Sequence, residues 1–112
     1  DYRVLGVRRM FTAIIVAALV QSAAINNQRD NYLNCLDQAV ASATAQKIPS
    51  AGFEAHLRQS CAEAATKFEG ALIAFDLKNK VPRKQAAADA QLQVDDLVDN
   101  VVERYRALAA RQ

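Results

Sequence analysis

Residues 53–75, FEAHLRQSCAEAATKFEGALIAF, decide how this chain folds. Their apolar side chains recur every three or four positions, which places them on one side of an α-helix in a stripe about 100° wide. The stripe consists of Phe53, Leu57, Cys61, Ala64, Phe68, Ala71, Leu72 and Phe75. We therefore expect one long amphipathic helix, from Ser50 to about Leu77 or Asn79, that packs against other helices on this face.

The opposite face of this helix carries acids placed four residues before bases. The pairs are Glu54 with Arg58, Glu63 with Lys67 and, just beyond the stretch, Asp76 with Lys80. In this orientation each pair stabilises a helix by roughly 0.2–0.5 kcal/mol. The pattern indicates that this face is in contact with water.

Two proline-containing segments separate this helix from one helix on either side. Pro49 pushes Ile48 away from helical angles, and Pro82 suits the first position of a helix. We expect the first helix to begin after a cap at Asp30 or Asn31 and to end near Lys47, and the third to run from Pro82 to about Ala110. Short connections make consecutive helices antiparallel neighbours. The sequence thus predicts an all-α fold, a three-helix antiparallel up-down-up bundle preceded by a hydrophobic helix that resembles a signal peptide.

Folding these helices about their turns predicts which residues face each other. The register places Phe53 opposite Leu108 and Cys35 opposite Cys61. Cys35 and Cys61 are the only cysteines of the chain. In an oxidising compartment two facing cysteines form a disulfide, and we expect Cys35 and Cys61 to do so if the protein is exported.

The N-terminal region has the three-part layout of a secretory signal peptide. Arg8 and Arg9 precede an apolar run over residues 10–20, and Ser22-Ala23-Ala24 offers the small residues of a cleavage site. We expect residues 1–24 to be a signal peptide or a membrane anchor and residues 25–112 to be the helical bundle domain. The expected location is the periplasm or outside the cell, with anchoring in the inner membrane as the alternative if residues 10–25 are retained. A third reading makes the run a buried helix.

Charge and motifs argue against several functional classes. The chain of 112 residues carries a net charge of +2, but the region after Arg9 holds 11 bases and 11 acids, so the folded part lacks the basic surplus of a nucleic-acid binder. His56 is the only histidine, and no nucleophile motif such as G-x-S-x-G accompanies it. We expect no catalytic residues, no cofactor and no metal site, because structural zinc needs four ligands and no calcium loop is present. An acidic band, Asp95, Asp96, Asp99 and Glu103, is interpreted as a solvated helix face.

The turn between the second and third helices is the expected contact site. The first helix is shorter than the other two, so residues 71–90 should project as a two-helix tip with apolar surface left exposed. The candidate partner-binding residues are Ile73, Leu77, Lys78, Lys80, Arg83 and Lys84. We expect a non-catalytic binding or scaffold protein that contacts a protein partner or a second copy there. The alternative function is a membrane-anchored accessory subunit of a larger complex.

Overall fold

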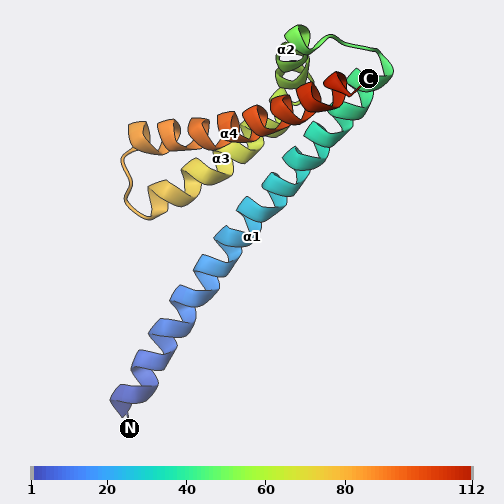
Figure 1. Ribbon diagram of the computed structural model, residues 1–112. Helices are drawn as coiled ribbons and strands as arrows, with labels where there is room; N and C mark the ends of the chain where they lie inside the picture. Colours follow the sequence, from blue (N-terminus) through green and yellow to red (C-terminus); the bar gives the residue numbers. More distant parts are fainter. Residues whose placement is uncertain (1, 112) are drawn as a thin grey trace.

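The computed structural model describes the backbone of residues 2–111 and the side chains of residues 22–111. Over this part the chain is all-helical, as predicted (Figure 1). Its helices are α1 (Tyr2–Ala45), α2 (Ser50–Ser60), α3 (Ala62–Lys78) and α4 (Arg83–Ala110). The expected break near Pro49 and the expected end of the last helix at Ala110 are both present. The predicted cap at Asp30 or Asn31 is wrong, because both residues lie inside α1. The expectation that the first helix is shorter than the other two is also wrong, since α1 spans 44 residues and α4 spans 28. A short first helix therefore does not account for exposed surface at residues 71–90.

The predicted signal peptide or anchor, residues 1–24, lies mostly outside the described side chains. Among the described residues, no helix combines the length and the apolarity that are needed to cross a bilayer.

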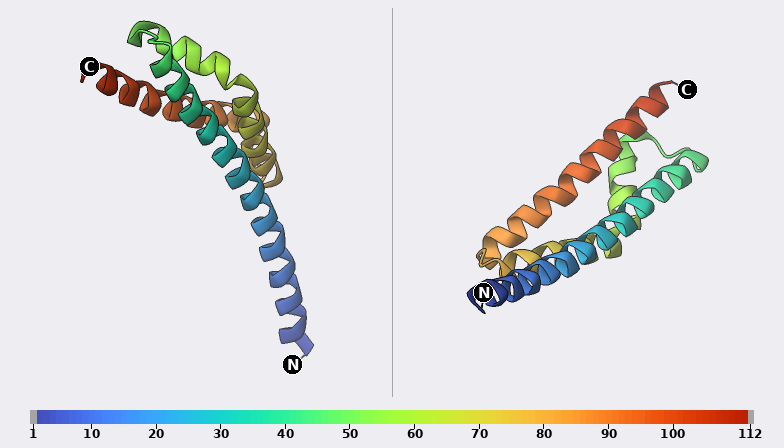
Figure 2. Two further views of the ribbon diagram at one scale, coloured as in Figure 1. Left: turned by 90° about the vertical axis from the view of Figure 1, so that its right-hand side faces the viewer. Right: turned by 90° about the horizontal axis from the view of Figure 1, so that it is seen from below.

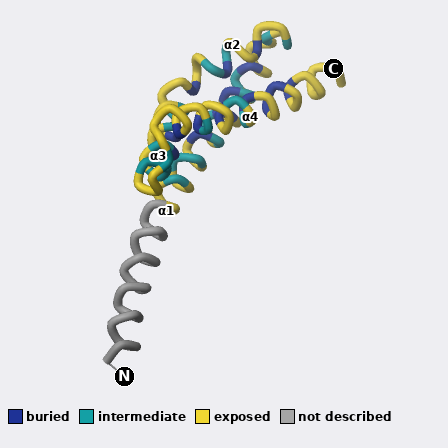
Figure 3. The backbone as a smooth tube through the Cα atoms, turned by 90° about the vertical axis from the view of Figure 1, so that its left-hand side faces the viewer, coloured by how far each residue is buried: buried dark blue, intermediate teal, exposed yellow. Residues whose placement is uncertain are grey.

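The core forms where α1 and α4 pack against α2 and α3. In Figure 2, α4 is separated from α1 along most of its length, and the two helices touch each other only sparsely. The stripe predicted for residues 53–75 supplies the buried Phe53, Leu57, Cys61, Phe68 and Leu72, α1 and α4 supply the other buried side chains, and the outer faces are exposed (Figure 3). Among the described residues, the largest fully buried side chains are Tyr32, Leu36, Phe53, Leu57, Phe68 and Val98. Burial of one such side chain contributes about 1.5–3 kcal/mol, so these six account for much of the stability of the core.

The expected long helix over residues 50–79 is in fact two helices that meet at Cys61. Cys61 has φ −115° and ψ 20°, outside the helical range, and it forms a disulfide with Cys35 of α1 across a Cα–Cα distance of 5.9 Å. The predicted pairing of Cys35 with Cys61 is confirmed. Kinks in helices usually coincide with proline, glycine or an inserted group, and here the disulfide occupies the junction.

The break at Cys61 explains an error in the predicted register. Phe53 stacks on the ring of Tyr105, with centroids 3.9 Å apart and planes 10° apart, and not on Leu108. Leu108 is 42% exposed. The predicted register assumes one straight helix through Cys61. Because α2 and α3 are separate helices that meet there, Phe53 contacts α4 at Tyr105, about one turn before Leu108.

Both reversals of the chain use the same helix-ending turn. At the end of α1, Lys47 adopts φ 57°, and the amide of Ile48 donates to the carbonyl oxygen of Ala43 at 3.0 Å. At the end of α3, Lys80 adopts φ 65°, and the amide of Val81 donates to the carbonyl oxygen of Asp76 at 2.9 Å. These are Schellman motifs, which satisfy carbonyl groups that a helix end leaves free.

Polar contacts tie α4 to the other helices. The guanidinium of Arg58 donates to Glu54 at 3.2 Å and to Asp95 on α4 at 3.1 Å. Burial alone lowers the pKa of Arg58, but the hydrogen bonds to Glu54 and Asp95 outweigh this effect, so the pKa lies above its ordinary value. The hydroxyl of Tyr105 donates its one proton to the carbonyl oxygen of Ile48, with the carbonyl oxygen of Ala43 3.4 Å away, and this contact anchors α4 to the turn between α1 and α2.

We predict that removing the disulfide weakens the fold substantially. The loop between Cys35 and Cys61 spans 26 residues, for which chain entropy gives a stabilisation of about 3–4 kcal/mol. Urea unfolding followed by circular dichroism should show this loss in the variant Cys35→Ala/Cys61→Ala. The wild-type protein treated with dithiothreitol serves as the control and should lose a similar amount. An unchanged unfolding midpoint in both samples would contradict the prediction.

Candidate functional site: the basic tip between α3 and α4

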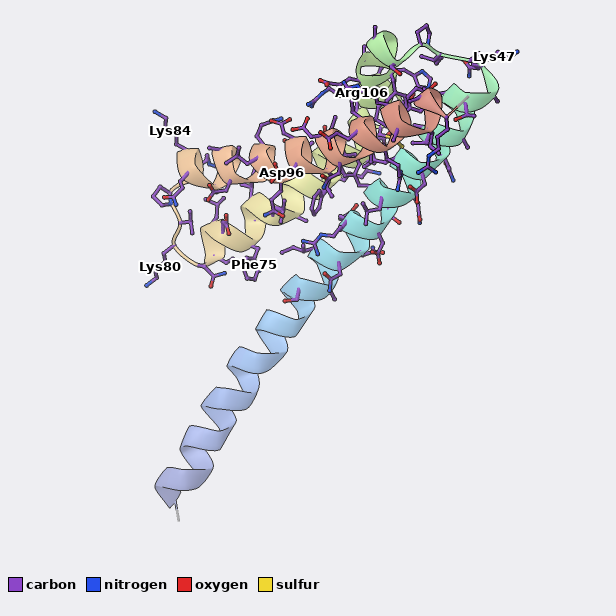
Figure 4. All side chains as sticks on the ribbon, in the orientation of Figure 1. Lys47, Phe75, Lys80, Lys84, Asp96 and Arg106 are labelled. Carbon is purple, nitrogen blue, oxygen red and sulfur yellow. A yellow bond between two sulfur atoms is a disulfide. The ribbon has the colours of Figure 1, made fainter. Side chains whose placement is uncertain are left out.

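The turn from α3 to α4 gathers four bases, Lys78, Lys80, Arg83 and Lys84, which we call the basic tip. All four side chains are exposed. Figure 4 shows Lys80 and Lys84 at this turn and Lys47 toward the opposite end of the bundle. The left-handed backbone at Lys80 reverses the chain, so bases from the end of α3 and the start of α4 come to lie around one turn.

The bases of the tip form no ion pair with any described side chain. The predicted pair of Asp76 with Lys80 is therefore absent, because α3 ends at Lys78 and Lys80 turns away from the helix. The predicted pairs on α2 and α3 are present, with Glu54 at 3.2 Å from Arg58 and Glu63 at 3.3 Å from Lys67. The tip thus keeps its positive charge available to a partner outside the bundle.

Two of these bases occupy an electrostatically unfavourable place. Arg83 and Lys84 begin α4, whose first turn contains no acid. The N-terminus of a helix carries a partial positive charge and favours acids, which typically contribute 0.3–1 kcal/mol there. Two bases at this helix N-terminus therefore lower the stability of α4. Residues that oppose the helix dipole in this way are expected mainly at functional sites.

The apolar part of the predicted site differs from the expectation. Ile73, one of the expected partner-binding residues, is partly buried and packs against the core. The reason is that α3 contacts both α1 and α4 and therefore buries a wider arc than one stripe. Leu77 is half-buried beside the bases, whereas the most exposed large apolar side chain among residues 22–111 is Leu92 on α4, at 61%. Leu92 is not among the predicted contact residues because it lies outside residues 71–90.

The other chemically notable residues do not assemble into a reactive site. The Nε2 atom of His56 is buried without a hydrogen-bond partner. Within the described part of the chain, no three His, Cys, Asp or Glu side chains are grouped to hold a metal ion. In the acidic band, Asp95 already accepts hydrogen bonds from Arg58 and Gln91, both at 3.1 Å. Burial raises the pKa of Tyr32 above its ordinary value.

A shallow groove lies at the opposite end of the bundle from the basic tip. It is lined by Thr44, Lys47, Ile48, Tyr105, Leu108 and Ala109. The hydroxyl of Tyr105 is already bonded to the backbone, and that of Thr44 donates to the carbonyl oxygen of Val40 at 2.8 Å. The groove therefore offers a ligand the single charge of Lys47, whereas the basic tip gathers four bases and is the stronger candidate site.

Comparisons with known proteins found no matching family model, no matching curated protein and no matching solved structure.

We predict that acids in place of Arg83 and Lys84 make the protein more stable. The variant Arg83→Glu/Lys84→Glu complements the helix dipole and should gain about 0.3–1 kcal/mol per residue, seen as a higher melting temperature by circular dichroism. The matched control, Arg106→Glu/Arg111→Glu near the other end of α4, places acids where the dipole disfavours them and should lower the melting temperature. A lower melting temperature for the first variant would show that the two bases stabilise the fold.

Proposed function

We propose that this chain is a small exported, non-catalytic binding protein that contacts a protein partner or a second copy through its 71–90 tip. The observation that carries the proposal is the basic tip, whose four bases are exposed and unpaired among the described residues. The half-buried Leu77 lies beside them and supplies apolar contact area. An interface needs such a combination, because apolar burial provides affinity and charge provides selection of the partner.

The proposal also covers the arrangement of the helices and the cellular location of the protein. We infer an antiparallel up-down-up bundle in which α1, the α2–α3 pair and α4 are the three layers. The contacts of α1 and α4 with both α2 and α3 support this arrangement. The disulfide supports a periplasmic or secreted protein, because disulfides persist in oxidising compartments.

The test of this function is a charge placed in the apolar part of the tip. Leu77→Asp should abolish self-association in light scattering or reduce recovery of partners that co-purify with the wild-type protein. Ile73 is left intact because it packs against the core, so its loss would also affect folding. The control Leu92→Asp changes an exposed leucine outside the 71–90 tip and should leave association unchanged. Equal behaviour of wild type and both variants would rule out this contact surface.

A second candidate function, a membrane-anchored accessory subunit, has its own support. Ser22, Ala23 and Ala24 of the candidate cleavage site lie inside α1, and the next residue, Ile25, packs against the core. Cleavage after Ala24 would interrupt this helix and place a charged amino terminus on a partly buried residue. This arrangement favours retention of the preceding segment.

Retention has a direct measurement. Mass spectrometry of the protein isolated from its native host should find residues 10–24 still attached to the bundle if the second candidate is correct. A mature chain that begins at Ile25 would exclude anchoring and leave the exported binding protein.

A further inference from the structure

The basic tip lies at the end of the bundle where α1 enters it. Tyr32 and Arg29 of α1 both lie against Phe68 of α3, with ring centroids 6.0 Å apart for the tyrosine and the guanidinium 5.5 Å from the ring of Phe68. The segment of α1 from Cys35 back to Ile25 and the segment of α3 from Cys61 to the tip therefore lead toward the same end of the bundle. Figure 1 shows the turn between α3 and α4 on the side of the bundle away from the C-terminal end of α1.

Lengths along the two helices place the tip and Ser22 at similar distances from the disulfide, although α1 and α3 diverge toward this end (Figure 1). Lys78 is 17 residues after Cys61, about 25 Å at a rise of 1.5 Å per residue. Ser22 is 13 residues before Cys35, about 20 Å. In the sequence, the apolar run over residues 10–20 comes just before Ser22. A bilayer that holds this run would therefore have its surface near the basic tip.

The chemistry of the tip fits a surface of lipid phosphates. Each lysine or arginine near an anionic leaflet strengthens binding about fivefold, and the tip offers four that have no ion pair within the described part of the chain. The bases are exposed and spread around one turn. This arrangement suits a bilayer surface, because lipid headgroups can approach each base separately. Half-buried Leu77 and Val81 add apolar area at the same place.

We propose that the basic tip rests on the headgroups of an anionic phospholipid bilayer and so fixes the orientation of the bundle on the membrane. This inference rests on the second candidate function, in which residues 10–24 remain attached. It also gives a reason for Arg83 and Lys84, which begin α4 against its dipole: their attraction to lipid phosphate offsets the stability that they lose within the protein.

The experiment uses the absence of tryptophan from the chain. Gln85→Trp places one fluorescent reporter on an exposed position of the first turn of α4, and Ala107→Trp places a control reporter on an exposed position near the other end of that helix. Each full-length variant is reconstituted into phosphatidylcholine vesicles with or without phosphatidylglycerol, with brominated lipids as quenchers. We expect a blue shift and quenching of the Gln85→Trp reporter only when phosphatidylglycerol is present, and no response from Ala107→Trp.

Charge variants then identify the source of the response. Lys78→Gln/Arg83→Gln/Lys84→Gln should weaken the contact about 100-fold and return the reporter to its signal in neutral vesicles. The control Lys47→Gln/Arg106→Gln/Arg111→Gln removes the same charge elsewhere and should leave the response intact. High salt should weaken the contact, because it screens exposed charges. Equal loss from both triple variants, or equal quenching in neutral vesicles, would overturn the proposal.

Two further outcomes are distinguishable. A reporter that ignores vesicles but responds to polyglutamate through the same three bases would indicate an acidic protein partner and overturn the lipid contact. The mass measurement of the native chain is independent of the reporter. A chain cut after Ala24 would contradict anchoring even if the reconstituted full-length protein touches the lipid, whereas an uncut chain with a silent reporter would refute the lipid contact alone.

Discussion

Cys35 and Cys61 join α1 to the junction of α2 and α3, and the rest of the packing depends on this link. Because Cys61 leaves helical angles, α2 and α3 follow separate directions. The change of direction lets Phe53 stack on Tyr105, whose hydroxyl then reaches the carbonyl oxygens at the turn between α1 and α2. The disulfide thus lies where α2 turns away from α3, and the direction of α2 brings Phe53 onto Tyr105 of α4. A straight helix through Cys61 would not allow this contact.

The helical class and most buried residues were predictable from the period of apolar residues, because that period records which side of a helix meets its neighbours. The break at Cys61 was not predictable, since the spacing of three and four continues through it. Ile73 was misplaced because a single stripe describes a helix with one partner face, whereas α3 has two. The two lysines with positive φ share a sequence pattern, since each is followed by a β-branched residue and a proline. The two segments are Lys47-Ile48-Pro49 and Lys80-Val81-Pro82.

The candidate site was predictable in its charge and less so in its apolar part. Four bases within seven residues indicate a positive surface wherever they fold. Sequence proximity does not show whether neighbouring acids neutralise such bases, and the structure adds that no described acid lies within ion-pair distance of the tip. It also shows that α4 begins with two bases and no acid. The site combines exposed charge with a local loss of stability, as expected where binding and folding place different demands on the same residues.

The two Schellman turns also bear on the order in which the chain acquires its structure. Each is specified by a few consecutive residues, so the pairing of α1 with α2 and of α3 with α4 depends on contacts that are close in sequence, which form quickly during folding. Cys35 lies in α1 and Cys61 immediately follows α2, so both sulfur atoms belong to the first of these hairpins. The disulfide therefore joins no residue of α4. A chain still emerging during synthesis has every residue of this covalent link before its last helix exists.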